Sequence, residues 1–198
     1  MTKIKICGIR RQADIDSLNK LRPEYAGFVF AKSTRQVNKD FAYSLIQNLR
    51  GDIKKVGVFV DENPLVVMKI AEKLHLDVLQ FHGHETQEYI NNFKGYEIWK
   101  AFKINSLESI SEIRHYKCAK FLLDNSTSGS GESFNWNLTY KKVDGSKIML
   151  AGGLNCENVC HGILKLNPYG VDVSSGVEIH GFKDYELIKE FIKKVRDL

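Results

Sequence analysis

The sequence alternates eight times between a short run rich in β-branched and aromatic residues and a longer stretch in which apolar residues recur at helical spacing, with a period of about 25 residues. Strands that alternate with helices predict a parallel sheet joined by right-handed crossovers. Eight such units with no segment left over fit a closed barrel better than an open doubly wound sheet, which is the alternative. We therefore expect an α/β protein with a (β/α)8 TIM barrel, formed as a single catalytic domain by residues 1–198.

The expected elements can be placed along the chain. Strands are expected over residues 3–7, 25–30, 55–60, 77–81, 96–102, 119–124, 147–151 and 170–174. Helices are expected over residues 12–21, 40–49, 64–75, 85–93, 107–116, 157–166 and 184–195, with a short one near 138–142.

The composition of the chain bears on its cellular location and on its binding partners. The start of the chain is interrupted by lysines, unlike a signal peptide, and no apolar run approaches the ~20 residues that span a bilayer. We expect a cytoplasmic protein with free cysteines and no membrane partner. The net charge of +5 is scattered, without a basic block interleaved with aromatic residues, so we expect no nucleic-acid partner. A mildly positive protein suits an anionic small-molecule substrate, and a monomer and a homodimer both stay open.

In a barrel of this class the chemistry lies at the carboxyl ends of the strands. At the end of the first strand, Ile4 and Ile6 share the outward face, whereas Lys5 and Cys7 point into the barrel. A lone cysteine is more often a small buried hydrophobe than a reactive group, but the strand-end position favours function for Cys7. A buried ammonium needs a partner, and Asp172 on the eighth strand is our candidate for Lys5.

The second and fourth strands end in groups that can contact a substrate. Arg35 can form two parallel hydrogen bonds to a carboxylate, or it is a solvated surface residue. His82 is expected to line the substrate pocket and His84 to face solvent. We expect no metal, because no matching set of ligands follows the fifth and sixth strands.

The later strands supply a carboxyl group and glycine loops. Asp124 follows three apolar residues, and a carboxyl group at the rim of a dry barrel can act as a general acid; the alternative is an aspartate that caps the next loop. That loop, residues 126–133, is rich in glycine and serine and can move over the substrate. The loops after strands seven and eight contain glycines and often bind phosphate in barrels. We expect phosphate at Gly152, Gly153 and Gly176.

These segments together resemble phosphoribosylanthranilate isomerases, the barrel enzymes of tryptophan biosynthesis. The resemblance runs the length of the chain and rests on an ordered set of segments: residues 5–9, 27–30 with Ser33 and Arg35, 56–59, 79–83 with Glu85, 122–124, 151–154 with Asn158 and Val159, and 171–178. One departure is visible, because the Gly-Gly usual in the family after the sixth strand is replaced here by residues 128–131, Ser-Gly-Ser-Gly.

The resemblance implies specific roles. Cys7 would be the general base, Asp124 the general acid and Arg35 the ligand of the anthranilate carboxylate. The backbone at Gly153 and at Ser175 and Gly176 would hold the phosphate. An Amadori rearrangement of this kind needs one acid and one base and no cofactor.

Two other functions stay open at this point. The related sugar isomerases of histidine biosynthesis run the same rearrangement, but they resemble a barrel with Asp rather than Cys at the first strand end. A phosphosugar-binding barrel without catalysis is the non-enzymatic alternative, against which the presence of both Cys7 and Asp124 argues.

Overall fold

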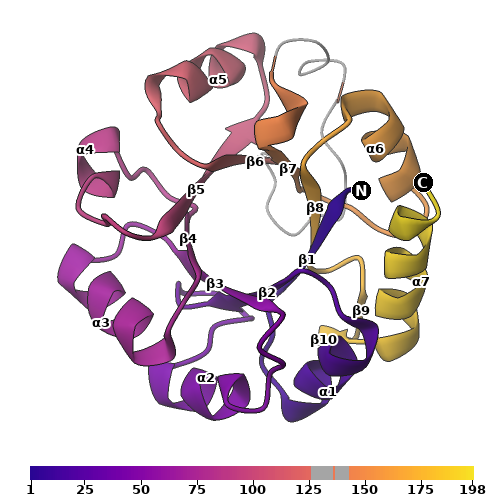
Figure 1. The fold of residues 1–198 in the computed structure, drawn as a ribbon. Helices are drawn as coiled ribbons and strands as arrows, with labels where there is room; N and C mark the ends of the chain where they lie inside the picture. The colour runs from indigo at the N-terminus through magenta and orange to yellow at the C-terminus, as the bar shows by residue number, and fades with distance from the viewer. Residues whose placement is uncertain (126–135, 137–142) are drawn as a thin grey trace.

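A computed structural model describes residues 1–125, 136 and 143–198. Eight parallel strands pair in sequence order, and β8 pairs with β1 to close the barrel (Figure 1). The predicted (β/α)8 barrel is confirmed, and the open-sheet alternative is wrong.

The elements follow the predicted alternation. The barrel strands are β1 (Lys3–Cys7), β2 (Tyr25–Val29), β3 (Lys54–Phe59), β4 (Val78–Phe81), β5 (Glu97–Ile104), β6 (Lys120–Asn125), β7 (Ile148–Leu150) and β8 (Gly170–Val173). The helices are α1 (Gln12–Leu21), α2 (Lys39–Ile46), α3 (Pro64–Leu74), α4 (Gln87–Ile90), α5 (Leu107–Glu112), α6 (Val159–Leu166) and α7 (Tyr185–Arg196), with short 3-10 turns at Ile113–His115 and Gly145–Lys147.

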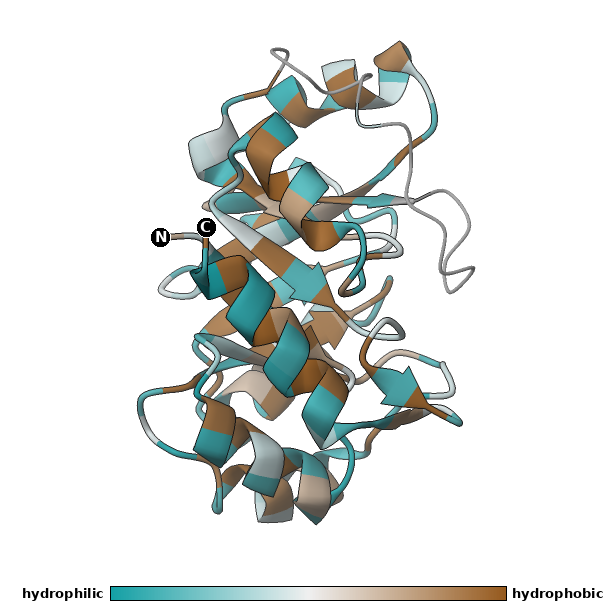
Figure 2. Cartoon of the chain, turned by 90° about the vertical axis from the view of Figure 1, so that its right-hand side faces the viewer, coloured by the Kyte–Doolittle hydropathy of each residue, from teal (hydrophilic) through white to brown (hydrophobic). Residues whose placement is uncertain are grey.

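The two-residue alternation of the strands divides the apolar side chains into two cores. One core fills the barrel and contains Tyr25, Val56, Val78, Trp99, Ala101, Leu122, Met149 and Ala151. The larger core lies between the strands and the surrounding helices and includes Ile4 and Ile6, as predicted. The outer helices accordingly carry apolar residues on one side and polar residues on the other (Figure 2).

Helix α7 shows how local sequence places these helices. The Asp184 side chain accepts a hydrogen bond of 3.0 Å from the backbone N–H of Leu187, which caps the first turn. Ile188, Phe191, Ile192 and Val195 then recur at helical spacing and are buried against the barrel. Among the residues that the structure describes, no helix is long and apolar enough to cross a membrane.

The structure corrects several expected boundaries. The helix expected over residues 85–93 is reduced to α4, because Glu85 is buried and Thr86 caps a helix that starts at Gln87. A small antiparallel hairpin, β9 (Glu178–Ile179) and β10 (Phe182–Lys183), follows β8 and was not predicted. The expected helix near 138–142 and the expected loop 126–133 lie outside the described residues.

Candidate active site

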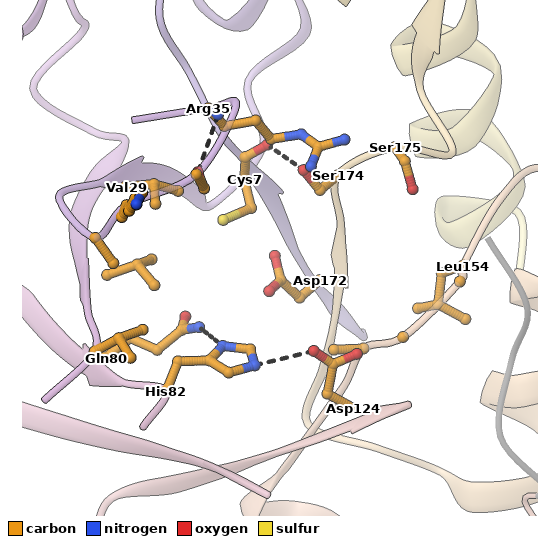
Figure 3. A pocket seen from close by; sticks show the side chains of 18 residues that line it. Cys7, Val29, Arg35, Gln80, His82, Asp124, Leu154, Asp172, Ser174 and Ser175 are labelled. Carbon is orange, nitrogen blue, oxygen red and sulfur yellow. Dashed lines mark hydrogen bonds and ion pairs between the residues drawn. The ribbon is translucent and has the colours of Figure 1, made fainter. Parts of the chain in front are cut away.

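A pocket opens at the carboxyl ends of the barrel strands (Figure 3). Its lining contains Cys7, Arg35, His82, Asp124, Gly152, Gly153, Asp172 and Ser175, so most of the residues singled out in the sequence meet at one place. Cys7 and Asp124 line the pocket from different sides in the view of Figure 3. Gly176 does not line it but lies directly behind the loop that does.

The predicted partner of Lys5 is confirmed. The Lys5 Nζ atom lies 2.9 Å from Asp172 Oδ2, and the lysine side chain is completely buried. Burial lowers the pKa of Lys5, but the Asp172 carboxylate and Cys7 together more than offset this effect, so the pKa is raised overall. The ammonium therefore stays charged next to Cys7.

Two buried ammonium groups and one carboxylate act on the Cys7 thiol. Burial and the Asp172 carboxylate raise the pKa of the thiol above its ordinary value, while the ammonium groups of Lys5 and Lys183 act in the opposite direction. The net pKa is raised, so Cys7 is mainly a thiol at neutral pH when the pocket is empty.

His82 contacts the carboxyl group of Asp124, an arrangement that the sequence analysis did not foresee. His82 Nε2 lies 3.0 Å from Asp124 Oδ2, and His82 Nδ1 lies 3.3 Å from Gln80 Nε2 (Figure 3). Because the Gln80 amide nitrogen is a donor, this contact requires Nδ1 to accept, which places the ring proton on Nε2. His82 thus donates to Asp124. His84 is fully solvent-facing, as expected, and binds Asp61.

Arg35 is held by a buried carboxylate rather than left free on the surface. Its Nε and Nη2 atoms donate to the two oxygens of Glu178 at 2.8 and 2.6 Å. Lys183 Nζ lies 2.5 Å from the same carboxylate. Burial raises the pKa of Glu178, but the bonds from Arg35 and Lys183 lower it further than burial raises it, so the group is ionised.

A guanidinium has two edges that can each bind a carboxylate. Glu178 occupies the edge formed by Nε and Nη2 of Arg35, which leaves the Nη1 side for another acceptor. Arg35 therefore lines the pocket in a fixed orientation.

The two glycine loops meet beside the pocket. Gly152 and Gly153 have φ angles of +76° and +68°, a conformation that side chains with a Cβ rarely adopt. A Cβ on Gly176 would lie 1.9 Å from the Leu154 carbonyl oxygen, so only glycine allows the loops to approach so closely. The backbone N–H groups of Gly153 and Ser175 make no hydrogen bond to the described residues. These N–H groups can bind an anion.

Glu178, Lys183 and Gln80 are the site residues that sequence reasoning missed. Glu178 and Lys183 belong to the unpredicted hairpin, and Gln80 reads as an ordinary polar residue within a strand. The signal available was the alternation of β4, which places Gln80 on the same face as His82. Among the described residues no group of three His, Cys, Asp or Glu side chains is arranged to hold a metal.

Comparison with known sequences places this architecture among characterised proteins. Residues 4–194 match the family model for N-(5'phosphoribosyl)anthranilate (PRA) isomerase. The chain is 49% identical over 202 residues to the N-(5'-phosphoribosyl)anthranilate isomerase of Thermoanaerobacter sp. (strain X514), covering all of both proteins. It is 48% identical over 202 residues to the enzyme of that name from Clostridium acetobutylicum, covering 99% of this chain and 98% of the relative.

Solved structures agree with the sequence comparison. The phosphoribosyl anthranilate isomerase of Thermotoga maritima matches with a TM-score of 0.90 and 33% identity, covering both chains completely. A phosphoribosyl anthranilate isomerase in complex with reduced 1-(o-carboxyphenylamino)-1-deoxyribulose 5-phosphate matches with a TM-score of 0.87 and 32% identity, again over both chains. A thiamine phosphate pyrophosphorylase from Pyrococcus furiosus, at 16% identity, shares the fold alone.

Proposed function

The chain belongs to the N-(5'-phosphoribosyl)anthranilate isomerase family, and from this premise we propose how its residues carry out the reaction. The enzyme acts in tryptophan biosynthesis and converts N-(5'-phosphoribosyl)anthranilate into 1-(2-carboxyphenylamino)-1-deoxyribulose 5-phosphate. The full-length match to this family favours that function over the histidine-pathway isomerase and over a barrel without catalysis.

Asp124 and Cys7 are proposed as acid and base. Asp124 donates a proton to the furanose ring oxygen, and the ring opens to an iminium at C1'. Cys7 removes the proton from C2', which gives an enolamine. The enol hydroxyl then loses its proton and C1' gains one, which gives the ketone. The observation that carries this assignment is the placement of Cys7 and Asp124 around one pocket that also holds Arg35 and the two glycine loops.

The Cys7 thiol must lose its proton before it can act as a base. Lys5 and Lys183 supply positive charge next to it, which stabilises the thiolate form. His82 Nε2 lies 3.0 Å from Asp124 Oδ2 and fixes the carboxyl group that gives its proton to the substrate. After the transfer, the same hydrogen bond stabilises the carboxylate that forms.

We expect replacement of Arg35 by alanine to raise KM about 10- to 100-fold with a smaller loss of kcat, because a carboxylate contact made in the ground state persists into the transition state. Arg35→Lys should restore only part of the affinity, since an ammonium cannot form the paired bonds. Steady-state kinetics with the fluorescent substrate measures both. Arg50→Ala, which removes a surface arginine paired with Asp52, is the control. Unchanged kinetics in Arg35→Ala would show that Arg35 does not bind the substrate and is only a surface charge.

The phosphate is proposed to bind the loops after β7 and β8. A structure with inorganic phosphate or product should show the anion at the backbone N–H groups of Gly153 and Ser175. Ser175→Asp should raise KM by about tenfold or more, because a carboxylate beside the phosphate repels it. Ser175→Ala keeps the backbone donor and should bind substrate almost normally. An anion found only elsewhere would contradict this assignment.

The domain organisation, the cellular location and the oligomeric state of the enzyme are further proposals. We propose that residues 1–198 form one domain, that the enzyme works in the cytoplasm, and that it is a monomer or a homodimer. A Thermotoga maritima relative is described as dimeric, which supports testing the dimer by light scattering.

A further inference from the structure

The β9–β10 hairpin places a carboxylate beside the arginine that is proposed to bind the carboxylate of the substrate. Glu178 begins β9, its side chain is only 5% exposed, and its two oxygens accept hydrogen bonds from Nε and Nη2 of Arg35 at 2.8 and 2.6 Å. A carboxylate at this place repels an anionic ligand. The position of Glu178 therefore needs an explanation other than direct attraction of the ligand.

Arg35 has little freedom to move in this arrangement. Two parallel hydrogen bonds to one carboxylate fix the plane of the guanidinium. The aliphatic part of the side chain packs against the backbone of Gly8, where a Cβ would lie 2.6 Å from Arg35 Cδ. The backbone N–H of Arg35 donates to Ser33 Oγ at 3.0 Å. The Nη1 side of the guanidinium is therefore held in one direction.

The hairpin that carries Glu178 is tightly built. Its turn residues, His180 and Gly181, both have positive φ angles, +51° and +78°, as in the two-residue turns that close the tightest hairpins. Arg10 donates from Nη2 to the Gly181 carbonyl at 2.5 Å and from Nη1 to the Thr34 carbonyl at 2.8 Å. This one side chain joins the hairpin turn to the segment that contains Arg35.

The second strand of the hairpin is attached to the same part of the barrel. The Phe182 ring contacts the guanidinium groups of Arg10 and Arg11, whose Cζ atoms lie 4.6 and 4.4 Å from the ring centroid. Arg11 also donates to the backbone carbonyl of Lys183 at 2.7 Å. The turn and β10 are thus both bound to the segment between β1 and α1, which fixes Glu178 relative to the pocket.

Lys183 offsets the negative charge of Glu178. Its Nζ atom lies 2.5 Å from Glu178 Oε1 and 3.0 Å from the Ser174 carbonyl oxygen, in a nearly inaccessible position. Two cationic side chains, those of Arg35 and Lys183, therefore contact one carboxylate, and the cluster keeps an excess of positive charge. A ligand carboxylate is still attracted, but Glu178 sets the direction in which Arg35 can receive it.

We propose that Glu178 is a positioning residue that makes the enzyme selective for a carboxylate ortho to the amine nitrogen on the aromatic ring of its substrate. The inference rests on the proposed function, because it takes Arg35 as the ligand of that carboxylate. With the phosphate held at the glycine loops, the ring of the substrate has a limited range of positions. A fixed guanidinium then meets a carboxylate on one ring carbon, whereas a mobile arginine would follow it to the neighbouring carbon.

The test uses three isomeric 1-(carboxyphenylamino)-1-deoxyribitol 5-phosphates, which carry the carboxylate ortho, meta or para to the nitrogen and are not turned over. Their affinities are measured by calorimetry and as competitive inhibition. The wild type should bind the ortho isomer at least about tenfold more tightly than either of the others, because only the ortho carboxylate reaches the fixed Nη1 side of Arg35.

Glu178→Gln keeps the size of the side chain but removes its charge and leaves one acceptor oxygen in place of two. Arg35 is then free to turn and one repulsive charge is lost, so the meta and para isomers should bind about three- to tenfold more tightly than they bind the wild type. The preference for the ortho isomer should fall to about threefold or less. Glu186→Gln, at an exposed glutamate paired with Lys189 on α7, is the matched control and should change no affinity.

Arg10→Lys tests the same arrangement from outside the pocket. A lysine keeps the charge but cannot bind the Gly181 and Thr34 carbonyls in the paired geometry of the guanidinium. The preference for the ortho isomer should fall by at least about twofold, because the hairpin is then less firmly held. This variant decides the question if circular dichroism shows that Glu178→Gln does not fold.

The direction of the changes separates positioning from damage to the fold. A gain of affinity for the meta and para isomers with a smaller preference for ortho supports the proposal, since a damaged pocket weakens the binding of all three. Equal affinities of the wild type for the three isomers would overturn it. An unchanged preference in folded Glu178→Gln, including a uniform gain for all three isomers, would also overturn it, because Glu178 would then act through its charge alone or not at all.

Arg35→Ala distinguishes a failure of this inference from a failure of the proposed function. If Arg35→Ala loses affinity for the ortho isomer while Glu178→Gln keeps the wild-type preference, the positioning role is wrong and the assignment of Arg35 stands. If Arg35→Ala binds the ortho isomer as tightly as the wild type, the proposed role of Arg35 itself is wrong.

Discussion

Replacement of Cys7 by serine is expected to lower kcat by at least about 10²-fold, while the affinity for product changes by less than about tenfold. A serine hydroxyl is hardly ionised at neutral pH, so the proposed base is lost. The anchoring contacts at Arg35 and the phosphate loops remain, which preserves binding. Single-turnover kinetics and product titration measure the two quantities separately.

The other cysteines provide matched controls. Cys156 and Cys160 have their Sγ atoms 3.7 Å from carbonyl oxygens of Leu187 and Lys194, at helix α7 and away from the pocket. Cys118 does not line the pocket, and burial raises its pKa to about 11. Serine at any of these three positions should leave turnover almost unchanged. Loss of activity in one of them together with an active Cys7→Ser would show that the base is assigned to the wrong strand.

Alkylation gives an independent measurement on Cys7. Iodoacetamide should inactivate the enzyme and bound product should protect it. Burial raises the pKa of this thiol, so its thiolate fraction keeps growing at pH values where an exposed cysteine is already fully ionised. The inactivation rate should therefore still increase with pH in that range.

Replacement of Asp124 by asparagine should also lower kcat by about 10²- to 10⁴-fold, because the amide keeps the shape of the side chain but has no proton to transfer to the ring oxygen. Product affinity should again stay within about tenfold of the wild type. Asp144→Asn is the control, since Asp144 caps a short 3-10 turn outside the pocket. Full activity in both Cys7→Ser and Asp124→Asn would mean that the enzyme does not work through this acid and base.

Much of the fold could be predicted because its determinants are local. The alternation of Ile4 and Ile6 with Lys5 and Cys7 assigned the two faces of β1, and the structure confirms both. The pairing of Lys5 with Asp172 could be predicted because a buried ammonium requires a nearby carboxylate and a closed barrel puts the eighth strand beside the first. Helix boundaries were less accurate. Glu85 is the example, because tertiary contacts with Lys100 and the backbone of Gly83 remove it from the expected helix.

The sequence by itself determined the number and order of the strands, the inward residues at their ends, and therefore which side chains enter the pocket. The tertiary structure decided which of these side chains meet. Arg35 and Glu178 are 143 positions apart and come together only because the barrel closes and brings the hairpin that follows β8 beside the segment between β1 and α1. The contact of His82 with Asp124 depends on strand stagger and side-chain rotamers. Alternation and helical spacing are properties of neighbouring residues, whereas these contacts are set by how distant strands align in the closed sheet.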